Sequence, residues 1–310
     1  MLITLFFLHH ILFVSPSFAQ DILKTIHLDS VIVVAVKGGF SVEDFIYMVR
    51  QDTSFYKAFK NLHYYPYKCE GVLTVFNKSE KEKATLYKKA TQYVKDKKRW
   101  MVIDEEKITG KMYDRKHEFN YYTAELFDFT FFPKDTFPAN NIISDKSDMT
   151  KPGSKNQNYK QKLKILVFNP GTEVSGVPLV GNKLAIFDND MIKYYDYKIS
   201  SDYYNDSIPC YVFTCKVKQG LGYFQKDDPV IKELVSYFDK RTFNIVSRKY
   251  VLSYSSVLFD FDVTMNIKLK QINGALVPEH ASYSGYWDIP FKSSEILSFR
   301  LKFYDHKIDE

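Results

Sequence analysis

Residues 257–269 constrain the fold of this chain more than any other segment. Seven apolar side chains alternate there with six others, all polar apart from Leu258. A period of two is the period of a β-strand, and this run is about twice the usual strand length. A strand that long, with neighbours of similar length, requires a twisted and curved sheet. Its apolar face must be covered by a helix, a second sheet or a ligand.

Other segments of the second half repeat this alternation, and turn residues such as Asn273-Gly274 separate them. Short turns between alternating strands are typical of an antiparallel meander. The predicted strands there are 191–200, 208–217, 231–238, 244–253, 257–269, 275–287 and 295–304. Earlier predicted strands are 31–36, 72–76, 84–94, 100–104, 126–132, 179–180 and 184–187.

Helices are expected mainly near the start of the chain. Ser41 can cap one helix, and Asp52 or Thr53 can cap a second. A third short helix is expected at 159–168, after a polar loop near 139–158. The predicted fold is mostly β (α+β), with a large curved antiparallel sheet or half-barrel and two or three helices packed on one face. The side chains expected against the sheet are Val42, Phe45, Ile46, Val49, Phe55 and Phe59.

The first nineteen residues have the pattern of a secretory signal peptide. They contain no charged side chain, and an apolar run leads to Ser17-Phe18-Ala19, with small residues at the −3 and −1 positions. An N-terminal membrane anchor is the alternative, although the run is short for about 30 Å of hydrocarbon. We expect cleavage after residue 19, export across the inner membrane, most plausibly to the periplasm, and one β-rich domain over 20–310. No transmembrane segment is expected after cleavage.

The three cysteines are expected to be buried and apolar. Cys210 and Cys215 are five positions apart, so in one strand they point to opposite faces about 16 Å apart and cannot bridge. An odd number of cysteines also leaves at least one thiol free in an exported chain.

Several chemistries find no support in the sequence. The 43 basic and 37 acidic residues are interleaved, which argues against a nucleic-acid-binding face. The stretch 176–183 resembles a phosphate-binding loop but contains Pro178 and lacks the final Ser or Thr. Asp260 and Asp262 share one strand face, a spacing that suits glycosidase acids or a cation site but also a solvated outer surface. No cofactor, metal site or catalytic residue is predicted, and we lean against an enzyme without excluding a hydrolase whose site is assembled from distant residues.

Three stretches, 38–45, 55–62 and 257–269 with 283–288, together resemble exported, uncharacterised proteins of Bacteroidota. In architecture alone, the signal peptide, early helices and long meander also look like the periplasmic lipoprotein-carrier group, the LolA-like half-barrels. That resemblance implies a half-barrel whose helices cover a face that holds acyl chains. It names no site residues, so none are carried over.

The functional hypothesis is an exported binding or carrier protein for an apolar ligand, such as an acyl chain or lipoprotein. It rests on a surplus of large apolar side chains along the long strands, which could line a cleft between helix and sheet. The alternative is a cell-envelope module that binds other proteins through its surface and has no ligand cavity. The candidate ligand-binding residues are Phe127, Phe129 and Phe131 on one wall, and Phe259, Phe261, Met265, Phe299 and Phe303 on another.

Overall fold

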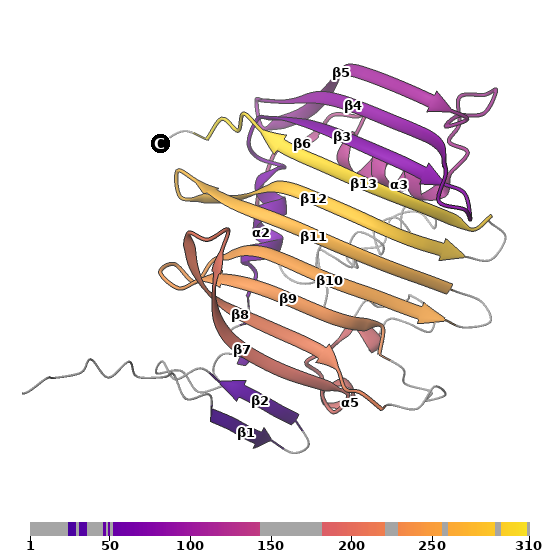
Figure 1. Cartoon of the computed structure of the whole chain (residues 1–310). Coiled ribbons are helices and arrows are strands. Elements are labelled where there is room, and N and C mark those ends of the chain that lie inside the picture. Colours follow the sequence, from indigo (N-terminus) through magenta and orange to yellow (C-terminus); the bar gives the residue numbers. More distant parts are fainter. Residues whose placement is uncertain are drawn as a thin grey trace, which may run out of the picture.

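One open sheet of 13 strands organises the molecule (Figure 1). This computed structural model describes residues 24–28, 31–35, 46, 47, 49, 52–142, 182–220, 229–255, 260–288 and 293–308. The strands are β1 Lys24–Leu28, β2 Val31–Ala35, β3 Tyr67–Phe76, β4 Glu82–Lys95, β5 Lys98–Gly110, β6 Phe137–Pro138, β7 Tyr195–Tyr204, β8 Ile208–Val217, β9 Ile231–Asp239, β10 Ile245–Ser255, β11 Asp260–Ile272, β12 Ala275–Asp288 and β13 Glu295–Tyr304.

The sheet consists of two meanders joined edge to edge, with the β1–β2 hairpin added at the β7 edge. Strands β7 to β13 follow one another in space as in sequence, and β3 to β6 do the same. The joint is an antiparallel pairing of β13 with β3, so the last strand of the chain lies beside one of the first. The β2–β7 contact is the parallel exception among these pairings. The predicted antiparallel meander is therefore confirmed.

Cross-strand register aligns apolar residues into rows on one face, which we call the inner face. Burial alternates along β11, as the period of two predicts. In the central row, Met265 lies opposite Tyr250 on one side and Tyr283 on the other. The row continues in both directions through Tyr197, Cys215, Leu234, Tyr250, Met265, Tyr283, Phe299, Leu73 and Leu86, all buried.

Helices α2 (Ser54–Asn61) and α3 (Tyr122–Phe131) both lie behind the sheet in Figure 1 and cover the inner face. The Phe55 ring on α2 packs beneath the guanidinium of Arg248, 4.4 Å from the ring centre. Asn61, near the end of α2, donates from Nδ2 to the Leu276 carbonyl at 2.8 Å. Together with the burial of Val49, Phe55 and Phe59, these contacts confirm the expected placement of this part of the chain against the sheet.

Several expectations fall outside the described residues. These are the signal peptide, the side chains of Val42 and Phe45, the strand at 179–180, the helix at 159–168 and most of the polar loop near 139–158.

Two predicted strands near the middle of the chain are wrong. Residues 126–132 belong mostly to α3, and 184–187 form the end of the short 3-10 helix η2 (Asn182–Leu184) and the turn after it. The strand predicted at 191–200 is present as β7, but it begins at Tyr195 because α5 (Asn189–Ile192) precedes it. Short apolar runs are ambiguous between strand and buried helix when only their periodicity is considered.

All three cysteines are buried and free, as expected. Burial raises the pKa of Cys69 to about 12 and that of Cys210 to about 11. Among the described residues, no helix has the length and apolarity needed to cross a membrane.

The inner face should dominate stability. Ile267 is fully buried on β11, whereas Ser284 is exposed on the outer face of β12. We predict that Ile267→Ala lowers the free energy of unfolding by about 2–5 kcal/mol, through lost burial and the cavity that remains. Ser284→Ala should change it by no more than about 0.5 kcal/mol. Chemical denaturation measures both values, and similar losses for the two variants would contradict the assigned faces.

His306 should make stability depend on pH. Its ring stacks on Tyr67 at 5.8 Å, and both ring nitrogens are buried without a hydrogen-bond partner. Burial, helped by Lys270, lowers the pKa of His306 to about 4, below the ordinary value of about 6.5. The unfolded chain therefore binds the proton more tightly, so this contribution is full above pH 6.5 and falls away as the pH drops towards 4.

His306→Phe keeps the stacking on Tyr67 but removes the titration. We predict that between pH 7 and pH 4 the variant loses less stability than the wild-type protein, measured by thermal unfolding. Parallel pH profiles for the two proteins would show that His306 does not titrate in this range.

Candidate functional site: the aromatic interface beneath α3

Helix α3 forms where a phenylalanine strand was predicted. Ala124, Glu125 and Leu126 are good helix formers, and Phe127 and Phe131 share a face at the i, i+4 spacing of a helix. Spacing by four satisfies a period of two as well, which explains the wrong prediction.

The N-terminus of α3 is held by an acidic side chain from the sheet. The carboxylate of Glu295, the first residue of β13, accepts hydrogen bonds from the backbone N–H of Tyr122 at 2.6 Å and of Thr123 at 2.9 Å. Such a carboxylate satisfies amides that have no partner within the helix and favours the positive end of the helix dipole.

Aromatic rings separate α3 from the sheet. The Phe127 ring lies 4.2 Å from that of Phe299 and 5.1 Å from that of Tyr283, measured between ring centres. The Phe131 ring lies 5.4 Å from that of Phe299 and 6.4 Å from that of Phe303. Offset and edge contacts of this kind contribute about 0.5–1.5 kcal/mol each beyond simple burial. These five rings, which we call the ring cluster, form the interface between α3 and strands β12 and β13.

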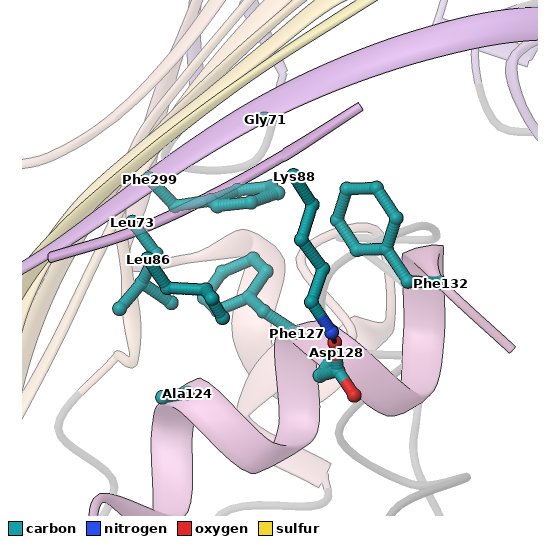
Figure 2. A pocket seen from close by; sticks show the side chains of 9 residues that line it. All are labelled: Gly71, Leu73, Leu86, Lys88, Ala124, Phe127, Asp128, Phe132 and Phe299. Carbon is teal, nitrogen blue, oxygen red and sulfur yellow. Dashed lines mark hydrogen bonds and ion pairs between the residues drawn. The ribbon is translucent and has the colours of Figure 1, made fainter. Parts of the chain in front are cut away.

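A buried ion pair crosses the same interface. Lys88 projects from β4 towards α3, where its Nζ contacts Oδ1 of Asp128 (Figure 2). The two side chains are only 3% and 5% exposed. Glu106 on β5 supplies a second carboxylate, 3.1 Å from the same Nζ. Charges removed from water cost free energy unless they are paired, so this arrangement ties α3 to β4.

The space around this pair is small. Figure 2 shows the Lys88 side chain passing between the rings of Phe299 and Phe132. Phe132 fits because residue 71 is a glycine, and a Cβ there would lie 3.2 Å from the Phe132 ring. The remaining cavity is about 10 Å³, enough for roughly one water molecule, and is lined by Gly71, Leu73, Leu86, Lys88, Ala124, Phe127, Asp128, Phe132 and Phe299.

Four of the eight candidate residues come together in the ring cluster: Phe127, Phe131, Phe299 and Phe303. Met265 lies beside the cluster, opposite Tyr283 in register. Phe261 is farther along β11, where its ring stacks on Trp287 at 4.8 Å. Phe129 does not share a wall with Phe127 and Phe131, since the helical turn leaves it 41% exposed. Phe259 lies outside the described residues.

Sequence reasoning missed the polar and aromatic partners of this interface. Lys88 did carry a signal, because it stands in phase with the inward residues Ala84, Leu86 and Ala90 of β4. A lysine at an inward position requires a buried partner. Tyr283 had no such signal in the sequence. In the structure, burial raises the pKa of its hydroxyl above the ordinary range.

The described residues contain no group of three or more His, Cys, Asp or Glu side chains that could hold a metal ion. Asp260 lies opposite Asp288 in register, and Asp262 is exposed opposite Tyr286.

No model of a known protein family matches the chain, and no curated protein matches it. Solved structures similar to it include the following three. A DUF1329 family protein from Desulfovibrio piger is 14% identical, with 85% of this chain and 90% of that chain covered and a TM-score of 0.24. A putative outer membrane lipoprotein-sorting protein domain from Vibrio parahaemolyticus is 10% identical, with 81% and 91% covered and a TM-score of 0.27. Lipovitellin is 8% identical, with 77% of this chain but 24% of that chain covered and a TM-score of 0.24.

The ion pair beneath α3 can be tested by a double-mutant cycle. Lys88→Met leaves the buried Asp128 carboxylate without its main partner, so we predict a loss of about 3–5 kcal/mol in the free energy of unfolding. Asp128→Leu alone completes the cycle. Combining it with Lys88→Met removes the buried carboxylate and leaves only the more exposed Glu106, so the double variant should return to within about 1 kcal/mol of the wild-type value or above it. Additive losses in the double variant, measured by urea denaturation, would show that the two residues do not interact.

Proposed function

We propose that this chain is an exported, periplasmic binding or carrier protein for an apolar ligand, such as an acyl chain or the lipid part of a lipoprotein. The ligand would lie between α3 and the inner face. The observation that carries the proposal is the ring cluster, in which aromatic side chains of the short helix α3 pack on aromatic side chains of the sheet. The export part rests on the signal-peptide pattern of the first nineteen residues.

The chemistry of the ring cluster suits an acyl chain. Phe299 and Tyr283 lie in the buried central row, with Leu73 on one side and Met265 on the other. This row offers a continuous apolar strip across several strands. Met265 adds an unbranched, polarisable side chain that adapts to irregular apolar shapes.

The ligand would have to replace the α3 side chains. The cavity of about 10 Å³ beneath the helix is far below the few hundred Å³ of a typical small-molecule site. An acyl chain would therefore take the positions of the Phe127 and Phe131 rings as α3 moves away. The apolar strip would then remain covered, so the ligand would compensate for the contacts that the helix loses.

The attachments of α3 are compatible with such a displacement. The polar contacts described above lie at its two ends: Glu295 at the N-terminus, and Lys88 at Asp128 near the C-terminus. A buried ion pair of this kind contributes less net stability than apolar packing of the same volume. Retaining one beneath an otherwise aromatic interface favours a helix that can leave the sheet.

The alternative, a surface-acting envelope module, is favoured by β5. Its side chains Val102, Ile103 and Ile108 are apolar and exposed. Val102 and Ile103 are adjacent, and the charged residues 104–107 separate them from Ile108. Exposed apolar residues grouped on one strand are a feature of protein-interaction surfaces.

Lipid extraction tests the carrier proposal. We expect mass spectrometry of the natively purified mature protein to detect co-purifying acyl species, and a dansyl-labelled fatty acid to gain fluorescence on binding. Phe299→Asp should lower the affinity for the probe at least tenfold, because a carboxylate would lie in the apolar strip. Phe129→Ala changes an exposed residue of the same helix and should leave binding unchanged.

A second variant keeps the test valid if Phe299→Asp fails to fold. Phe127→Ala combined with Phe131→Ala removes the rings that the ligand must displace, so probe affinity should rise. A folded wild-type protein that yields no acyl species and does not bind the probe would overturn the carrier proposal and favour the surface module.

A further inference from the structure

A second, polar groove lies away from the ring cluster, beside α2. It has a volume of about 500 Å³ and lies where α2 approaches the start of β10 and the tight turn between β11 and β12. Its lining is Ser54, Lys57, Asn61, Tyr65, Asn141, Asn244, Asn273, Gly274, Ala275 and Leu276.

Side-chain amides dominate this lining. Four of its ten residues are asparagines, one is a lysine, and none is acidic. Each amide offers both a donor and an acceptor, which matches the paired hydroxyl groups of a sugar ring. A lining of this kind is poorly suited to an acyl chain, which would leave the amides without partners. It is also poorly suited to Ca²⁺ or Mg²⁺, whose protein sites usually include carboxylate ligands.

Internal hydrogen bonds hold part of the groove in place. Asn61 is buried and accepts at Oδ1 from Asn141 Nδ2 at 2.8 Å, and Lys57 Nζ donates to the Asn141 carbonyl. Asn273 donates from Nδ2 to the Ile308 carbonyl at 2.9 Å, which fixes the turn that forms the far wall. Groups positioned in this way lose little conformational entropy when a ligand binds.

Other groups of the lining keep their hydrogen-bonding capacity. Within the described part of the chain, neither the Asn244 amide nor the Tyr65 hydroxyl makes a side-chain hydrogen bond. Lys57 Nζ has three donors, of which the Asn141 carbonyl takes one. Burial, with a smaller effect from Lys60, lowers the pKa of Lys57, so an anionic partner would recover interactions that this ammonium group has lost with water.

We propose that this groove binds a saccharide that carries a carboxylate, a sugar acid. The Asn244 and Asn141 amides hydrogen-bond its hydroxyl groups, the Tyr65 ring packs against its apolar face, and Lys57 binds the carboxylate. The site is independent of the ring cluster, so the two can succeed or fail separately. It would give the protein a polar ligand in addition to the apolar one.

Saturation-transfer NMR on the mature protein tests the site with D-glucose, D-galactose, D-glucuronate and D-galacturonate at millimolar concentration. We expect saturation transfer to at least one uronate, with an affinity several-fold higher than for the matching neutral sugar. Asn244→Leu keeps the branched shape of the side chain without its amide and should lower the affinity about tenfold, which corresponds to roughly 1.4 kcal/mol. Lys57→Met should abolish the preference for the uronate and leave neutral-sugar binding within about twofold.

Gln271→Ala is the matched control, because it removes an exposed amide of β11 that lies outside the groove. It should leave all affinities unchanged, and thermal unfolding should show that every variant is folded. The absence of saturation transfer to all four sugars would overturn the proposal. Binding that both groove substitutions leave unchanged, or that Gln271→Ala weakens as much as they do, would also overturn it.

Discussion

The pairing of β13 with β3 is the interaction on which the rest of the structure depends. It places Phe299 opposite Leu73, and so joins the apolar row of the C-terminal meander to that of β3 and β4. Without it, each meander would expose an edge, and the rows would end before they reached α3. The same pairing positions Glu295 and Lys88, which both contact α3. Glu295 begins β13, and Lys88 lies on β4, the strand next to β3.

The two helices show how differently one apolar face can be covered. α2 meets the sheet through Phe55 beneath Arg248, and Asn61 fastens its end to the β12 backbone. Its neighbour α3 is separated from the sheet by large rings and is held by charges. The first arrangement is specific and local, whereas under the proposed function an apolar ligand would replace the second. That contrast explains why the apolar proposal concerns α3 and the polar one lies beside α2.

Sequence reasoning predicted the sheet well because alternation along a strand is a local property. β8 and β13 have the predicted bounds, and β11 has the predicted burial pattern. The segment from Phe127 to Phe131 was wrongly predicted as a strand, because a spacing of four fits both a strand and a helix. Glu295, which caps α3, is distant in sequence and gave no local signal. The same reason hid the polar groove, whose asparagines come from four separate segments and meet only in the folded chain. Lys88 was visible as an inward lysine, but its partner Asp128 was not.

If the chain is exported to an oxidising compartment, as proposed, its buried cysteines affect how it survives there. Thiolate is the reactive form in disulfide exchange, and with a pKa of about 12 for Cys69 only about one thiol in 10⁵ is ionised at pH 7. Once the strands have paired, the buried thiols are therefore unreactive in disulfide exchange, although they form no disulfide. Before that they are exposed and have ordinary reactivity, so wrong disulfides are a hazard of the nascent chain alone. Under the proposed export, the speed of sheet assembly, more than any feature of the finished fold, would set how much of the protein escapes oxidation.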